Sequence, residues 1–183
     1  MDEAGRGSLL GPVVAGAVII PEDEELFSHI KDSKSMSPVS REKAFSLICK
    51  YAISVSVGVV SHRFIDKYNI HNATLEAMKK AVLGLSKMPD LILVDGIHKI
   101  PVPIPQKCIK KGDKLNKIIS AASIVAKVYR DRILNAYHRD YPMYNLSKNK
   151  GYPTKEHLKK IRIYGPCPLH RYSFKGVREF VKD

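Results

Sequence analysis

The chain has 183 residues, 44% of them hydrophobic, which suits one domain with a sizeable core; it offers no stretch expected to span a bilayer or to act as a signal peptide. Its net charge of +13 is uneven, because residues 1–91 hold 11 basic and 11 acidic residues whereas residues 92–183 hold 20 and 7. This asymmetry favours a polyanion partner such as nucleic acid, contacted mainly by the second half. A basic surface without a specific partner, or contact with a ribosome or an acidic protein, is the alternative.

The first part of the chain predicts a strand, a helix and a second strand. The apolar run over 11–20 is rich in Val and Ile and predicts a buried strand. A helix is predicted over 37–52, with Ser37 as N-cap and Pro38 at the first helical position. The alternation over 53–61 predicts a strand that places four apolar residues on one face: Ile53, Val55, Val57 and Val59.

The second part predicts longer helices and shorter strands. Helical spacing appears over 69–86, followed by a short buried strand over 91–96 that ends in an acid and a glycine. The proline-containing segment 101–113 predicts an extended edge or loop. A long helix with a small-residue face is predicted over 114–141, and another helix over 154–165.

Strands and helices therefore mix without a strict β–α–β alternation, and the early strands predict a hairpin. We expect an α/β fold in which a mixed β-sheet is flanked by helices. Because we see no internal repeat or linker, we expect a single domain over residues 1–183.

Four acidic residues stand out by their context. Asp2 and Glu3 lead into the first strand, Asp95 ends the short apolar strand, and Asp113 precedes the long helix. Loops at strand ends are where α/β sheets build their sites. Taken singly, each acid also fits a structural role, since Asp95 with Gly96 forms a common turn pair and Asp113 suits a helix cap.

Together these acids would lie near one sheet edge of an otherwise basic chain. Carboxylates placed side by side repel one another unless protons or cations compensate. Mg²⁺ prefers oxygen ligands in octahedral geometry. A carboxylate cluster inside a cationic rim therefore predicts metal ions that act on a phosphate ester.

Asp131 is not expected to belong to this cluster. It lies 18 residues after Asp113, which is roughly 27 Å along the axis if one helix joins them. Its neighbours Arg130 and Arg132 suit a structural or surface ion pair.

Gly5, Arg6 and Gly7 predict a turn whose backbone can approach a ligand closely. Its N–H and C=O groups suit a ribose 2′-hydroxyl, the group that distinguishes RNA from DNA, and Arg6 suits a phosphate. A plain tight turn between strands is the alternative.

The stretch "KNKGYPTKEH" interleaves Lys148, Lys150 and Lys155 with Tyr152. Such a pattern suits a groove for a nucleic-acid backbone with a sugar or base stacked on the ring. Packing of the ring on the core is the alternative. Lys34 lies in a polar loop, where it would contact phosphate or simply be solvated.

Other kinds of site lack their signatures. The chain has no H-E-x-x-H motif, no paired cysteines of zinc sites, no complete P-loop and no G-x-S-x-G motif of serine hydrolases. Its three cysteines, Cys49, Cys108 and Cys167, are far apart and odd in number. We therefore expect reduced thiols in a cytoplasmic protein.

Taken together, these motifs resemble prokaryotic type 2 ribonuclease H, ribonuclease HII. Eight matching stretches follow the order of that family from residue 2 to about residue 174: "DEAGRG" with "GPVVAGAV", "DSK", "NIHNAT", "LVDG", "KGD", "ISAASIVAKVYRD", "KGYPT" and "HRYSF". Each short match is weak alone, but their shared order is strong evidence.

The resemblance implies a ribonuclease-H-like core over about residues 1–140 and a helical C-terminal part over about 141–183 that lies against the substrate. It implies endonucleolytic cleavage of RNA in RNA–DNA hybrids and 5′ to single ribonucleotides in duplex DNA, which serves ribonucleotide removal and RNA primer processing. The products would carry 3′-hydroxyl and 5′-phosphate ends.

By position, the catalytic acids of the family fall on Asp2, Glu3, Asp95 and Asp113. The resemblance implies that they bind two Mg²⁺ or Mn²⁺ ions at the scissile phosphate. One ion would activate a water and the other would stabilise the leaving 3′-oxygen.

The substrate-reading residues of the family also fall on this chain. The resemblance implies that Gly5, Arg6 and Gly7 read the 2′-hydroxyl and that Tyr152 stacks on the deoxyribose after the ribonucleotide. Lys34 in the matched "DSK" is a candidate phosphate contact. We expect a monomer without membrane contact, and a sliding clamp is a candidate partner near the C-terminus.

The chain differs from the family pattern at its start, where only Met1 precedes the Asp-Glu pair instead of several apolar residues. Either the protein starts upstream, or its central strand is clipped and Asp2 is held less firmly. The second case gives an alternative function, a non-catalytic protein that binds RNA or hybrids. Ribonuclease HIII, a relative with an extra N-terminal substrate-binding domain, fits this chain less well.

Overall fold

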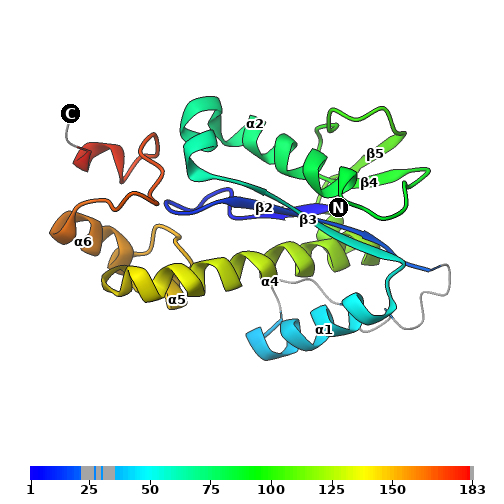
Figure 1. The fold of residues 1–183 in the computed structure, drawn as a ribbon, viewed down its shortest axis with the longest axis horizontal. Coiled ribbons are helices and arrows are strands. Elements are labelled where there is room, and N and C mark those ends of the chain that lie inside the picture. The colour runs from blue at the N-terminus through cyan, green and yellow to red at the C-terminus, as the bar shows by residue number, and fades with distance from the viewer. Residues whose placement is uncertain (22–26, 28–29, 31–35, 182–183) are drawn as a thin grey trace.

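Three antiparallel strands form the centre of the protein in a computed structural model that describes residues 1–21, 27, 30 and 36–181. Their order is β1 (Asp2–Ala4), β2 (Val13–Ile19) and β3 (Ser54–Val60), with Asp2 opposite Gly16 (Figure 1). The predicted hairpin is therefore present, and it places the first acid at the middle of the sheet.

Two parallel strands form a second, two-stranded sheet beside β1. These are β4 (Ile92–Asp95) and β5 (Gln106–Ile109), and β5 lies at the edge as its prolines predicted. Met1 joins the two groups, because its amino nitrogen donates to the Leu93 carbonyl at 2.6 Å and its own carbonyl accepts from the Asp95 N–H at 3.0 Å. Antiparallel and parallel pairs together confirm the mixed sheet.

Helices cover both faces of this sheet, and no helix in the described part of the chain is long and apolar enough to cross a membrane. α2 (His62–Leu83) lies on one face, while α1 (Pro38–Tyr51) and α4 (Lys117–Asp140) lie on the other (Figure 1). Ser37 caps α1 as predicted, because its hydroxyl accepts from the Ser40 N–H.

Two glycines let the helices approach the sheet. A Cβ at Gly16 would lie 2.4 Å from the Ala122 carbonyl oxygen of α4, and a Cβ at Gly58 would lie 1.9 Å from the Ala77 carbonyl oxygen of α2. Any side chain at these positions would push a helix outward. Close helix–sheet packing is therefore built into β2 and β3.

The two faces of β3 are buried to different depths. Val55 and Val57 pack against the cluster beneath α1 and α4, whereas Val59 is 41% exposed. The opposite face, with Ser54 and Val60, is more deeply buried. The alternation was predicted correctly, but the valine face is not the more deeply buried one.

Two helix boundaries differ from the sequence prediction. α2 begins at His62, capped by the Ser61 hydroxyl, and a kink at Asn69 (φ 68°) marks where the predicted helix was placed to start. The long helix is interrupted, because the Asn116 side chain caps α4 and leaves α3 (Gly112–Leu115) as a separate short helix.

The C-terminal part lies at one end of the sheet (Figure 1). It contains four short elements: η2 (Pro142–Tyr144), α5 (Leu146–Asn149), α6 (Lys155–Tyr164) and η3 (Arg178–Phe180). Thr154 caps α6, as its predicted start requires. A separate apolar cluster that includes Leu10, Leu134 and Ile161 joins this part to the β1–β2 loop and α4.

Candidate active site

Three of the four predicted acids belong to β1 and β4, which Met1 joins side by side. Asp2 is buried and is hydrogen-bonded with Ser123 of α4. Glu3, the next residue of the strand, lines a cavity of about 340 Å³ beside α2, and Asp95 lines the same cavity. Successive residues of a strand point to opposite faces, so the two acids of β1 are presented to different sides of one strand.

The charges of these acids act on one another. Burial raises the pKa of Asp2 to about 7, with the charges of Glu3 and Asp95 adding to the rise. Burial also raises the pKa of Glu3, with Asp95 adding to the rise and Arg6 opposing it. Burial is the larger cause for both acids, and the smaller effect of charge places Asp95 close enough to interact with Asp2 and Glu3.

Asp113 lies next to this group through its neighbour in α3. The Gly112 N–H donates to Asp95 Oδ1 at 2.7 Å, and Asp113 itself is buried. A left-handed Lys111 (φ 59°) turns the chain from β5 into α3. The structure thus brings together, around the ends of β1 and β4, segments that are far apart in the sequence.

The donor set suits a hard divalent cation. Within the described residues, no three His, Cys, Asp or Glu side chains are arranged closely enough to hold a metal ion. The chemistry of the acids nevertheless fits, because each offers only carboxylate oxygens and a cation would stabilise the charged form that burial disfavours at Asp2 and Glu3.

The predicted Gly-Arg-Gly turn follows β1 directly. Gly5 adopts φ 94°, which favours glycine, and is buried, whereas Arg6 and Gly7 are exposed. The Arg6 guanidinium pairs with Glu3 at 3.3 Å. The turn therefore lies beside the acids.

Tyr152 lies on the other side of the turn. A Cβ at Gly7 would lie 4.0 Å from its ring, and the Arg130 guanidinium lies 5.6 Å from the ring centroid. The ring is partly exposed, so it is not buried in the core. Lys34, the remaining predicted contact, lies outside the described residues.

Two buried arginines were missed as site residues. Arg130 and Arg171 are both fully buried; the Arg171 guanidinium donates to carbonyls of the turn, and the Arg130 guanidinium donates to the carbonyls of Pro12 and Lys150. Burial, together with the charge of Arg130, lowers the pKa of Arg171 to about 9. Arg130 lies within the matched stretch "ISAASIVAKVYRD" and Arg171 within "HRYSF". These matches were the sequence feature that could have indicated both residues.

A pair of buried histidines was also missed. His170 Nδ1 accepts from the Cys167 N–H at 2.9 Å, so its Nε2–H donates to His157 Nε2 at 3.2 Å. His157 Nδ1–H then donates to the Tyr152 carbonyl at 3.0 Å. This chain of donors ties α6 and the C-terminal segment to the backbone of Tyr152.

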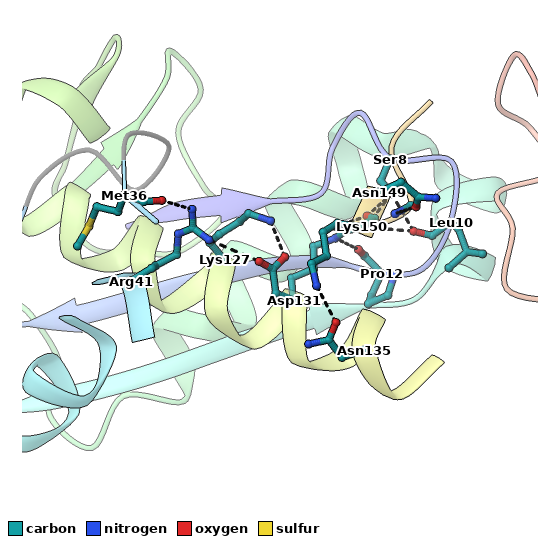
Figure 2. Close-up of polar contacts among 12 residues, drawn as sticks. Ser8, Leu10, Pro12, Met36, Arg41, Lys127, Asp131, Asn135, Asn149 and Lys150 are labelled. Atoms are coloured by element: carbon teal, nitrogen blue, oxygen red, sulfur yellow. Dashed lines mark hydrogen bonds and ion pairs between the residues drawn. The ribbon is translucent and has the colours of Figure 1, made fainter. Parts of the chain in front are cut away.

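Asp131 forms the predicted ion pair, but with other partners. Lys127 Nζ lies 2.5 Å from Asp131 Oδ1, and Arg41 lies 3.6 Å from Oδ2 (Figure 2). Arg130 instead points to the β1–β2 loop, and Arg132 pairs with Glu42. Asp131 thus has a structural role.

Comparison with known proteins decides the family. The ribonuclease HII family profile matches residues 1–177. The chain belongs to the ribonuclease HII family. A ribonuclease HII of Geotalea daltonii is 52% identical over 183 residues, which are 100% of this chain and 84% of that protein.

Solved structures agree. The ribonuclease H2 of Pyrococcus horikoshii has a TM-score of 0.82 at 28% identity, over 98% of this chain and 94% of that one. The ribonuclease HII of Archaeoglobus fulgidus, solved in complex with PCNA, has a TM-score of 0.80 at 27% identity, over 95% and 93%. The ribonuclease-H-like fold is thereby confirmed.

Membership of the ribonuclease HII family establishes the activity. The chain is a ribonuclease H, a metal-dependent endonuclease that cleaves RNA in RNA–DNA hybrids and 5′ to ribonucleotides embedded in duplex DNA. The activity was predicted correctly from the ordered motifs.

Proposed function

We propose that Asp2, Glu3, Asp95 and Asp113 are the catalytic acids of this ribonuclease HII. The observation that carries the proposal is that Glu3 and Asp95 line one cavity while burial and shared charge raise the pKa of Asp2 and Glu3. Carboxylates on β1, β4 and α3 of a strongly basic chain suit a phosphodiester held between cationic surfaces.

The four carboxylates would hold two Mg²⁺ or Mn²⁺ ions. When bound, such ions activate a water for in-line attack and stabilise the charge on the leaving 3′-oxygen. The chain contributes placement: Asp2 is fixed in the ladder with β2, and Asp95 is fixed by the Gly112 N–H. Arg6 offsets the charge of Glu3 at the rim.

The turn after β1 and Tyr152 would together recognise the ribonucleotide. Gly5, Arg6 and Gly7 would read the 2′-hydroxyl through backbone groups, and Tyr152 would stack on the next deoxyribose. Their support is that the turn begins directly after β1 and lies against the Tyr152 ring. The phosphate beside a 2′-hydroxyl would thereby be the one presented to the acids.

The remaining proposals concern the wider surface. Residues 141–183 would form a substrate-binding part attached to the core at 1–140, and Lys34 would contact a phosphate. The PCNA complex of the Archaeoglobus relative supports a sliding clamp as a partner of this chain. We propose a monomer that works in the cytoplasm.

Cleavage of a DNA duplex that contains one ribonucleotide tests the acids. With Mg²⁺ or Mn²⁺, we expect Asp95→Asn and Asp113→Asn each to lower the cleavage rate at least ~100-fold, because each removes a charge at the reacting phosphate. Asp90→Asn, an exposed acid before β4, is the matched control and should cleave normally. Full activity of either site variant would refute the assignment.

Family membership overturns the alternative of a non-catalytic binding protein. In the same assay the unaltered chain should make a 5′-side nick with Mg²⁺ or Mn²⁺. For Tyr152→Ala we expect roughly tenfold greater loss on the single ribonucleotide than on an all-RNA strand. Equal loss on both substrates would indicate a packing role.

A further inference from the structure

Arg171 holds the carbonyl groups of the recognition turn. Its Nη2 donates to the Gly5 carbonyl at 2.8 Å, and its Nη1 donates to the Arg6 carbonyl at 2.9 Å. Its Nε donates to the Gly11 carbonyl at 3.0 Å, at the far end of the loop. One side chain from the C-terminal part therefore fixes both ends of the segment that begins at the turn.

Arg130 connects the same loop to the segment that carries Tyr152. Its Nη2 donates to Ser8 Oγ at 2.7 Å and its Nε donates to the Pro12 carbonyl at 3.1 Å, while its Nη1 donates to the Lys150 carbonyl at 2.9 Å. Figure 2 shows Ser8, Pro12 and Lys150 gathered where these bonds converge. Arg130 thus bridges the loop and the segment that carries Tyr152.

The two arginines also lie against the turn and the ring themselves. A Cβ at Gly5 would lie 2.0 Å from Arg130 Nε, so the backbone of the turn rests directly on this side chain. The Arg130 guanidinium carbon also lies 5.6 Å from the centroid of the Tyr152 ring. The Arg130 side chain therefore contacts both the turn and the ring.

Both arginines bury a charge, which is unfavourable unless hydrogen bonds compensate it, so their hydrogen-bond partners are well defined. Both guanidinium groups are fully buried, and among the described residues neither forms an ion pair with a carboxylate. Burying a charge costs free energy unless hydrogen bonds satisfy it, and here carbonyl and hydroxyl groups do so. The guanidinium is a rigid planar fork, so it fixes the separation of the groups that it joins.

We propose that Arg130 and Arg171 are positioning residues that set the distance between the Gly5–Gly7 turn and Tyr152, and that this distance determines the preference for a single ribonucleotide in DNA. The proposal rests on the function proposed above for the turn and Tyr152. A lone ribonucleotide can be read in one register only, so the turn and the ring must be correctly spaced at once. A continuous RNA strand offers neighbouring registers, which tolerate a looser spacing.

Arg130→Lys and Arg171→Lys test this proposal, because lysine keeps the charge but cannot bridge the same set of carbonyls. The readout is the ratio of kcat/KM on a duplex with one ribonucleotide to kcat/KM on an RNA–DNA hybrid, measured below the unfolding temperature of each variant. We expect the ratio to fall at least ~tenfold in both, as small misplacements of positioning groups cost large factors in rate. An unchanged ratio in either would overturn the proposal.

Arg132→Lys is the matched control, since Arg132 lies two residues from Arg130 on the exposed side of α4. Its ratio should equal that of the unaltered chain, and a comparable fall would overturn the specific role of the buried pair. If the lysine variants fail to fold, the same ratio is measured for Ser8→Ala. It removes one acceptor of Arg130, so the ratio should fall by a smaller factor, and no fall would refute the proposal.

This design separates the two levels of the account. If Tyr152→Ala loses equal activity on both substrates, the function proposed for the turn and the ring fails. If Tyr152→Ala affects the single ribonucleotide more and the lysine variants keep the ratio, only the positioning role fails.

Discussion

At the scale of single residues, the site depends on backbone groups held by buried side chains. Gly5 rests on Arg130, and its carbonyl is held by Arg171. Neither arginine was predicted from the sequence as a site residue, because a charged residue in a helix or near a chain end is usually exposed. Their burial depends on carbonyls from segments more than 100 residues away, which no local pattern reveals.

Gly5→Ala should destabilise the protein more than an alanine at another left-handed glycine. At Gly5 the Cβ meets the pinned Arg130 side chain, whereas at Gly165 (φ 73°) nothing lies within 4 Å. Gly165→Ala should cost about 1–3 kcal/mol of backbone strain, and Gly5→Ala about 1–3 kcal/mol more from overpacking. Denaturant unfolding measures the loss of stability in both variants. Equal losses would show that the Arg130 side chain moves aside to accommodate the added methyl group.

His170 should make stability depend on pH. It faces His157 of α6, Cys167, Tyr144 of η2 and, at longer range, His62 of α2. Burial, assisted by the charge of His157, lowers the pKa of His170 from 6.5 to about 3. The unfolded chain therefore binds a proton below pH 6.5 that the folded chain does not bind until near pH 3, so stability is lost as the pH falls through this range.

The expected loss from this residue is about 1.4 kcal/mol per pH unit below 6.5, or about 2 kcal/mol between pH 7 and pH 5. Denaturant unfolding at the two pH values measures it. His170→Gln should flatten the dependence even if it lowers stability overall, while the exposed His98→Gln should leave it unchanged. If His170→Gln leaves the pH dependence of the free energy of unfolding unchanged, His170 is not its source.

At the scale of elements, the hydrophobic pattern predicted β2, β3, β4 and most helices, but it did not predict β1 and it missed boundaries set by single polar side chains. Asn116 splits the long helix by capping α4, and this places Asp113 in α3 beside Asp95. Asn69 kinks α2, so its first segment was not predicted. The four acids were predicted from the motifs, whereas the placement of β1 beside β4 depends on Met1, which no pattern revealed.

Gly58→Ala should test the close contact of α2 with the sheet. The added methyl would overlap the Ala77 carbonyl, which is backbone and cannot rotate away. We expect a loss of about 1–3 kcal/mol in the free energy of unfolding. The half-exposed neighbour Val59→Ala should cost under about 1 kcal/mol. Similar losses at both positions would mean that α2 moves freely.

At the scale of the whole molecule, charge separates the protein into a neutral first half and a basic second half. The acids come from both halves, whereas Lys148, Lys150 and Lys155 surround Tyr152 in the second. Binding of a duplex should therefore weaken at least ~tenfold between 50 and 200 mM salt, because each phosphate contact releases counterions. Titration by fluorescence anisotropy measures this, and affinity independent of salt would contradict a basic groove.

We propose that the acids cleave at a phosphate selected by the neighbouring turn, and Glu3 is the residue that joins the two. It belongs to β1, lines the cavity with Asp95 and pairs with Arg6. The most direct measurement compares Glu3→Gln with the unaltered chain on an end-labelled duplex that contains one ribonucleotide, in Mg²⁺ or Mn²⁺. We predict that the unaltered chain makes one nick on the 5′ side of the ribonucleotide and that Glu3→Gln binds the duplex without cleaving it. A Glu3→Gln variant that nicks the same bond at the same rate would contradict the claim.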